Sequence, residues 1–245
     1  MDVLTQHEIS EANHRILNPF TDDKLMLLGK ICRLQPGQRQ LDLACGKGEM
    51  LCRWAESFGI TGRGVDISDV FLGAARERAI ELGVSERLAF FLADAAHNDV
   101  ADGLYDVVSC IGATWIGDGP AGTVELMRPR MTKDGLMLIG EPFWNEPPPA
   151  EAARPQHGLD EFTSLIGTLD IFESVGMQLV EMVLADGDSW DRYVAAQWWT
   201  VSEWLRTTSD EAGAQVMRTK FDESRRWYLE YGRRYLGWGV FVLRV

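Results

Sequence analysis

Apolar positions over residues 39–141 fall mostly into short runs, separated by segments with helical spacing. The runs predict five strands, at 39–44, 61–66, 88–92, 105–110 and 136–141. The segments between them predict helices at about 48–58, 68–83 and 120–131. Strands that alternate with helices at this spacing are typical of a parallel, doubly wound sheet that is buried on both faces. The predicted fold class is therefore α/β and Rossmann-like.

Further elements flank this alternating core. Residues 7–17 and 21–34 predict two short N-terminal helices, and Thr21 is a plausible N-cap for the second. After the fifth strand we expect a helix over 159–175, a sixth strand over 177–184 and a final strand over 238–243. The pattern therefore predicts seven strands in all.

We expect these elements to form a single domain over residues 1–245. Its parts are N-terminal helices in 1–35, a core in 36–185, a helical insertion in 186–236 and a final strand in 237–245. The insertion is rich in Trp and Tyr, which favours an ordered segment. Long insertions of this kind are usually functional lids or disordered segments. We therefore interpret 186–236 as a lid over the carboxyl ends of the strands, where ligands of such sheets bind.

The segment from Leu41 to Glu49 carries the clearest chemical signal. It runs from a buried strand into a glycine turn and then into a helix. Gly46 and Gly48 remove two β-carbons where the backbone turns and a ligand can approach closely. About twenty residues later, Asp66 ends the second strand. A glycine turn followed by such an acid is how an α/β fold holds an adenosine nucleoside, with the carboxylate on the ribose hydroxyls.

This turn does not match a dinucleotide-binding fingerprint. That pattern requires a third glycine at position 51, where the chain has Leu51. Glu49 also lies near the helix N-terminus, at the place that a pyrophosphate would occupy. A cofactor without phosphate fits better, and a nicotinamide-dependent oxidoreductase is the weaker alternative.

The run Asp42-Leu43-Ala44-Cys45-Gly46-Lys47-Gly48 resembles the first motif of class I S-adenosylmethionine-dependent methyltransferases. Many members carry a glycine and a small residue where this chain has Ala44 and Cys45. The resemblance implies a seven-stranded sheet that is mostly parallel with an antiparallel last strand. It also implies S-adenosyl-L-methionine as the cofactor and a methyltransferase activity.

The same resemblance assigns cofactor contacts to the ends of successive strands. It implies the following set for the methionine part, the ribose and the adenine: Asp42, Ala44, Cys45, Gly46, Gly48, Asp66, Ile67, Asp94, Ala95 and Cys110. Within this set Asp66 corresponds to the ribose-binding acid and Ile67 flanks the adenine. Asp94 is the expected partner of the adenine amino group.

The chain is also similar from end to end to a bacterial subgroup of small-molecule methyltransferases. The segments that carry this similarity are His14–Phe20, Gly112–Gly117, Ile139–Trp144, Ser189–Tyr193 and Gly237–Phe241. The subgroup does not specify the molecule that accepts the methyl group.

The acceptor side is predicted to lie in the part of the chain from Trp115 onward, which holds eight of the nine tryptophans. Trp115 follows the fourth strand and Glu141 ends the fifth, so both are expected to face the cleft. Candidates for a general base are His14, His97, Glu141 and Tyr193. Aromatic faces with interspersed acids suit a small cationic acceptor or a planar aromatic one.

Two other functions use the same motifs. The cofactor could donate its aminocarboxypropyl arm instead of its methyl group, or undergo cyclisation. The chain could also be a non-catalytic binding module that retains the cofactor pocket. The products S-adenosylhomocysteine and methylthioadenosine distinguish the first of these from methyl transfer.

Composition narrows the class of partner. The formal net charge is −13, which argues against a nucleic-acid substrate because phosphate-binding surfaces need Lys and Arg. No signal peptide and no apolar run of about 20 residues is visible, so we expect a cytoplasmic protein with no membrane partner. The four cysteines lack metal-binding spacing, which predicts reduced thiols and no metal. No feature of the sequence sets the oligomeric state.

Overall fold

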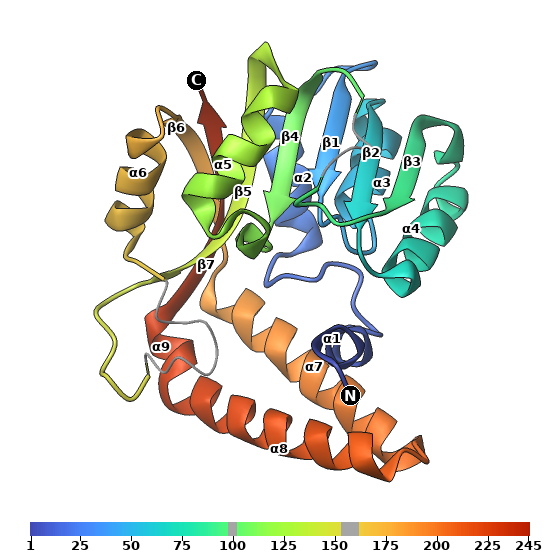
Figure 1. Ribbon diagram of the computed structural model, residues 1–245, viewed down its shortest axis with the longest axis vertical. Coiled ribbons are helices and arrows are strands. Elements are labelled where there is room, and N and C mark those ends of the chain that lie inside the picture. Colours follow the sequence, from blue (N-terminus) through green and yellow to red (C-terminus); the bar gives the residue numbers. More distant parts are fainter. Residues whose placement is uncertain (98–101, 153–161) are drawn as a thin grey trace.

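The computed structural model describes residues 1–97, 102–152 and 162–245. It contains one seven-stranded sheet in the order β3-β2-β1-β4-β5-β7-β6 (Figure 1). The strands are β1 Arg39–Leu43, β2 Thr61–Asp66, β3 Leu88–Leu92, β4 Tyr105–Ile111, β5 Met131–Trp144, β6 Gln178–Leu184 and β7 Leu236–Arg244.

Only the last strand reverses direction. Strands β1 to β5 pair in parallel, whereas β7 runs antiparallel to both β5 and β6. The predicted fold class, a mostly parallel Rossmann-like sheet with an antiparallel last strand, is confirmed. Because the parallel strands share one direction, the loops after β1, β2, β3 and β4 all lie at one edge of the sheet.

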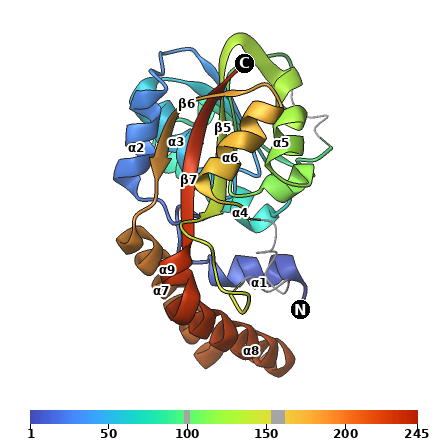
Figure 2. The ribbon, with the colours of Figure 1, turned by 90° about the vertical axis from the view of Figure 1, so that its left-hand side faces the viewer.

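Helices cover both faces of the sheet, as Figure 2 shows edge-on. Helices α2 (Asp22–Ile31) and α3 (Glu49–Phe58) pack on one face, and α5 (Pro120–Met127) and α6 (Leu165–Ser174) on the other. Helix α4 (Asp69–Glu81) follows β2. Trp54 of α3 is fully buried and its indole N–H donates to the carbonyl of Leu25, which ties α3 to α2. Each face of the sheet thus has its own apolar core.

Helices α7 (Gly187–Thr207) and α8 (Glu211–Trp227) occupy the long connection between β6 and β7. Together with α1 (Val3–Ser10) they lie beyond the carboxyl edge of the sheet (Figure 1). Val201, Met217 and Phe221 form a small core between α7 and α8, and Ile9 of α1 packs against it. A π-helix over Tyr228–Gly232 and the short helix α9 (Arg233–Tyr235) then lead into β7. The second half of the chain therefore meets its N-terminus over one end of the sheet.

Several predicted element bounds need correction. The first helix spans Val3–Ser10 and not 7–17, because Asp2 caps it at the amide of Thr5 and the chain turns after Glu11. The second helix ends at Ile31, since Arg33 adopts a left-handed conformation with φ of 52°. Strand β5 is longer than predicted because β7 pairs with it as far as Trp144.

The helix expected over 159–175 begins at Leu165 in the structure. Ser164 accepts a hydrogen bond from the amide of Gly167 and so caps the helix. Residues 159–161 lie outside the described residues. In the part of the chain that the structure describes, no helix is both long enough and apolar enough to cross a membrane.

Candidate active site

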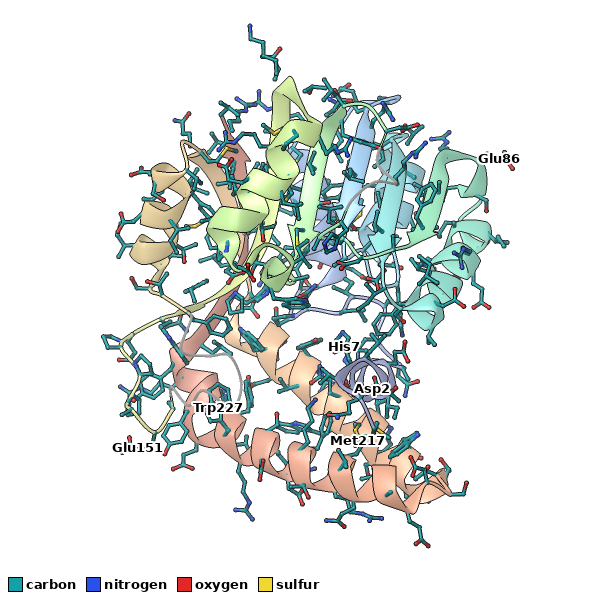
Figure 3. The ribbon with its side chains drawn as sticks, in the orientation of Figure 1. Asp2, His7, Glu86, Glu151, Met217 and Trp227 are labelled. Carbon is teal, nitrogen blue, oxygen red and sulfur yellow. The ribbon has the colours of Figure 1, made fainter. Side chains whose placement is uncertain are left out.

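A cavity of about 750 Å³ opens at the carboxyl edge of the sheet, under α1 and the start of α7. Its walls come from the turns after β1, β2, β3 and β4 and from the segment that joins α1 to α2. Figure 3 shows His7 projecting from α1 toward this edge, and His7 lines the cavity. The sequence-predicted residues that line it are Asp42, Ala44, Cys45, Gly46, Asp66, Ile67, Asp94, Ala95, Trp115 and Tyr193.

The turn after β1 brings the backbone to the cavity wall. Ala44 and Gly46 both have positive φ, 55° and 53°. The positive φ of Gly46 favours glycine, and a β-carbon there would lie 2.7 Å from the end of the Leu17 side chain, which would have to shift. Gly48 also has positive φ, but a β-carbon there would meet Phe90 of β3. Gly48 is not among the described residues that line the cavity, so its role is in packing.

Asp66 ends β2 with a carboxylate that is held by backbone amides. Its Oδ2 accepts from the amide of Gly46 at 2.8 Å and its Oδ1 from the amide of Ser68 at 2.9 Å. Burial raises the pKa of this carboxyl, and the two amides oppose that effect. The glycine turn and the acid were separate signals in the sequence. The hydrogen bond from the Gly46 amide to Asp66 joins them in one wall of the cavity.

Asp42 lies deep in β1 and is buried. The hydroxyl of Ser109 on β4 donates to its Oδ1 at 2.6 Å. Burial raises the pKa of Asp42 to about 7, and the Asp66 carboxylate adds to this shift while Ser109 opposes it. Two carboxyl groups in one cavity favour a ligand that brings positive charge or hydroxyl donors.

Asp94, Ile67 and Ala95 line the far end of the cavity, at the ends of β2 and β3. Asp94 is half exposed: its Oδ1 accepts from the amide of Ala96 and its Oδ2 lies 3.0 Å from Nδ1 of His97. The hydrogen bond from His97 lowers the pKa of Asp94. His97 is therefore engaged with Asp94 at the surface, which does not suit the role of a general base.

Near the end of β4, one of the predicted site residues lines the cavity and two others are buried behind its wall. Trp115 lines the cavity and is 72% exposed, in the short helical turn Thr114–Gly117. Cys110 is fully buried and is not one of the described residues that line the cavity. Glu141 of β5 is also buried behind the wall, where its Oε2 accepts from the Thr114 hydroxyl at 2.6 Å. Glu141 therefore does not face the cleft as predicted. The turn Thr114–Gly117, which its carboxylate supports, lies between Glu141 and the cavity.

His14 and Tyr193 are not arranged as free bases. The Tyr193 hydroxyl donates to Oε1 of Glu11 at 2.7 Å and to the carbonyl of Leu17 at 3.0 Å. Burial and the Glu11 carboxylate raise the pKa of Tyr193 well above its ordinary value. His14 lies behind the cavity wall, with Nδ1 at 3.1 Å from Oε2 of Glu11. Both candidates therefore contact the same buried carboxylate.

Comparison with known proteins agrees with this geometry. A family model described as a methyltransferase domain matches residues 41–133. The uncharacterised protein YjhP of Escherichia coli (strain K12) is 46% identical over 99% of both chains. A SAM-dependent methyltransferase of Geobacter sulfurreducens, solved in complex with S-adenosylhomocysteine, is 45% identical with a TM-score of 0.93, covering 99% of this chain and 98% of that one. A second, from Thiobacillus denitrificans and also in complex with S-adenosylhomocysteine, is 43% identical with a TM-score of 0.93 over the whole of both chains.

The chain belongs to the S-adenosylmethionine-dependent methyltransferases. The family resemblance drawn from the sequence is confirmed. Among the described residues of this methyltransferase, no three His, Cys, Asp or Glu side chains are grouped as metal ligands would be.

The sequence reasoning missed two residues of the methyltransferase site, Glu11 and Lys47. Lys47 belongs to the turn after β1, and its Nζ donates to the carbonyls of Glu11, Ala12 and His14 at 2.7 to 2.9 Å. Gln197 joins Tyr193 in donating to the carboxylate of Glu11. A lysine inside the glycine turn was a usable signal, because a buried ammonium needs several acceptors. The sequence offered no comparable signal for Glu11.

Proposed function

We propose that this methyltransferase transfers the methyl group of S-adenosyl-L-methionine to a small-molecule acceptor. The observation that carries the proposal is the single cavity that joins the turn after β1, the acids Asp42 and Asp66 and an aromatic wall from Trp115 and α7. The bound cofactor would supply an electrophilic methyl group on a sulfonium. The chain supplies position and exclusion of water, which account for most of the rate of such a transfer.

The residues of the cavity suit the cofactor in its parts. Ala44, Cys45 and Gly46 offer backbone at the turn, and Asp66 offers carboxylate oxygens to the ribose hydroxyls. Ile67, Asp94 and Ala95 form the adenine end. Asp42 faces the same space, and a cationic ligand beside it would favour its charged form.

We propose that segment 186–236 acts as the lid of the acceptor side. Trp190 and Tyr193, in the first turns of α7, line the cavity. Trp198 and Trp204 pack in the small core between α7 and α8, whereas Trp199 is 69% exposed. The aromatic residues of the insertion thus divide between the cavity wall and the support behind it.

Glu141 would act as a positioning residue. Its carboxylate accepts a hydrogen bond from the Thr114 hydroxyl, and Thr114 is the first residue of the turn that carries Trp115. Tyr193 would likewise hold the wall in place, because its hydroxyl is hydrogen-bonded to the Glu11 carboxylate and the Leu17 carbonyl. With Glu141 and Tyr193 in positioning roles, the acceptor would have to provide a nucleophile that reacts without a general base from either residue.

Calorimetric titration with S-adenosylmethionine, S-adenosylhomocysteine and NADH tests the cofactor assignment. Micromolar binding of the first two and none of NADH is expected. Failure of both to bind, in the presence and absence of candidate acceptors, would contradict the proposal. Once an acceptor is found, chromatography of the products should show S-adenosylhomocysteine. Methylthioadenosine would instead indicate transfer or cyclisation of the aminocarboxypropyl arm.

A further inference from the structure

The cavity does not end at the cofactor residues. It continues across the sheet to β7, where Phe20, Leu25, Leu28, Met50, Trp238 and Val240 line it. We call these six residues the apolar arm. In the sheet order, β7 lies four strands away from β2, which carries Asp66. Four inter-strand spacings amount to about 19 Å, so a nucleoside held at β2 and β1 leaves the arm for a second molecule.

All six residues of the apolar arm are buried and none carries a charge. Their exposed fractions range from 0% to 8%, and they belong to the core between α2, α3 and the sheet. Phe20 and Trp238 meet edge to face, with ring centroids 5.4 Å apart. The arm is therefore an opening into a hydrophobic core rather than a surface groove.

The charged residues of the cavity lie elsewhere or are neutralised. Asp42, Asp66 and Asp94 lie at the cofactor end, and Asp118 directly follows the turn Thr114–Gly117 after β4. Arg15 also lines the cavity, and its guanidinium pairs with Glu81 at 3.3 Å. Glu49 receives two hydrogen bonds of 2.9 Å from the guanidinium of Arg78. The Lys47 ammonium is directed at three backbone carbonyls. A charged molecule entering the arm would lose its hydration with no residue of opposite charge among the six that form the arm, which disfavours its binding.

We propose that the acceptor is an uncharged, largely apolar molecule whose apolar part occupies this arm. The inference rests on the proposed function and selects between the cationic and the aromatic acceptors that the sequence left open. Apolar surface that is buried in the arm favours binding in proportion to its area. The arm offers no carboxylate that would pair with an amine, so a neutral molecule gains most from it.

The test uses three matched probes: 1-naphthalenemethanol, the 1-naphthylmethylammonium ion and 1-naphthoate. Each is titrated into the full-length protein saturated with S-adenosylhomocysteine, and binding is measured by calorimetry and by displacement of the neutral fluorophore N-phenyl-1-naphthylamine. We expect the alcohol to bind at least tenfold more tightly than either ion. Equal or tighter binding of the ammonium ion would overturn the proposal, because the aromatic faces would then act as a cation site. Tighter binding of the carboxylate, or no binding of the alcohol, would overturn it as well.

Two variants of α2 locate the probe. Leu28→Phe fills the arm and should weaken binding of 1-naphthalenemethanol at least fivefold, with the affinity for S-adenosylhomocysteine changed less than twofold. Leu27→Phe is the matched control, because Leu27 is 46% exposed on the same helix and should leave both affinities unchanged. If Leu28→Phe lowers the melting temperature markedly, Leu25→Phe repeats the test from a second position in the wall. Unchanged binding of the alcohol in a folded variant would contradict the proposal.

The titrations also separate this inference from the proposed function. If S-adenosylhomocysteine does not bind to the wild-type protein, the cofactor assignment fails. If it binds while the probes show no preference for the neutral compound, only the apolar acceptor is wrong.

Discussion

The hydroxyl of Tyr193 on α7 donates a 2.7 Å hydrogen bond to Glu11, 182 positions earlier in the chain. Glu11 is fully buried directly after α1, and it also contacts Gln197 and His14. This one carboxylate therefore connects the N-terminal helix to the insertion on the far side of the cavity. The closed shape of the site depends on the contact, because α1 and α7 lie beyond the sheet that organises the rest of the fold.

Tyr193→Phe removes a donor from a buried carboxylate. We expect the variant to lose about 2 kcal/mol of unfolding free energy, measured by urea denaturation. Cofactor affinity should fall with it, while the pH profile of turnover keeps its shape, because the phenol does not titrate in the active range. Tyr235→Phe is a control outside the cavity wall. Loss of one limb of the pH profile in Tyr193→Phe would show that the phenol is the general base after all.

Lys47→Met tests the anchor between the turn after β1 and the N-terminal segment. The variant keeps the aliphatic stem but loses hydrogen bonds to the carbonyls of Glu11, Ala12 and His14. We expect amides of residues 3–10 to exchange at least tenfold faster, and S-adenosylhomocysteine to dissociate faster. Hydrogen exchange and stopped-flow measurements report these two effects. The exposed Lys30→Met is the control, and identical exchange in both variants would remove Lys47 from this role.

Asp66→Ala should weaken binding of S-adenosylmethionine by more than about 1.5 kcal/mol, as expected for lost charge-assisted hydrogen bonds to the ribose. Because Asp66 also holds the amides of Gly46 and Ser68, part of this loss reflects a looser turn. Asp66→Asn keeps the size of the side chain and should fall between wild type and Ala. Asp69→Ala, at an acid with a 75% exposed side chain, serves as the control in calorimetry. An unchanged affinity in Asp66→Ala would exclude this carboxylate from the site.

Trp115→Ala separates the two halves of the cavity. The indole is 72% exposed, so its loss should not unfold the protein. We expect cofactor affinity to change less than twofold and turnover of the acceptor to fall at least a hundredfold. Trp199→Ala is a matched control, because Trp199 is 69% exposed and belongs to α7. If the cofactor affinity of Trp115→Ala collapses, the assigned division between cofactor and acceptor sides is wrong.

The raised pKa of Asp42 predicts a dependence of stability on pH. The carboxyl titrates near pH 4 in the unfolded chain and at about 7 in the folded protein. Between these values the folded state holds a proton that the unfolded state has released. The unfolding free energy therefore falls as pH rises from about 4 to about 7, by about 1 kcal/mol per pH unit.

Asp42→Asn removes this dependence, since an amide does not titrate. Urea denaturation at pH 5 and pH 7.5 should show the wild type losing stability relative to Asp42→Asn as pH rises. Parallel behaviour of the two proteins would mean that Asp42 is charged at both pH values. Asp66 is present in both proteins, so its own titration largely cancels in the comparison.

Local sequence patterns were sufficient to predict the positions of most of the strands. The predicted ranges of β2 and β3 coincide with the observed Thr61–Asp66 and Leu88–Leu92. Strand β3 is a short apolar run between turn signals, and β2 ends with Val65 and the acid Asp66. Thr21 also caps its helix as predicted, and Ser68 caps α4 in the same way; each side chain accepts from the amide three residues later. The turn after β1 was also predictable from the local sequence, because a positive φ, as at Gly46, favours glycine.

Contacts between residues distant in sequence determined the element bounds and side-chain positions that local patterns did not predict. The end of α1 and the length of β5 depend on partners distant in sequence, namely Lys47 for the segment after α1 and β7 for β5. Similarly, Glu141 was predicted to face the cleft from its place at a strand end, but Thr114 covers it. A side chain at a strand end can point to either side of the loop that follows, and only packing determines which.

The order of apolar and small residues was enough to determine the sheet, its helices and the motif that identifies the family, because these depend on neighbours within a few positions along the chain. The cavity as a whole depended on the tertiary structure. Its outer wall exists because the carboxylate of Glu11 and the ammonium of Lys47 cannot be buried without partners, and those partners come from opposite ends of the sequence. The apolar arm likewise arises where α2, α3 and β7 meet, and no single segment encodes it.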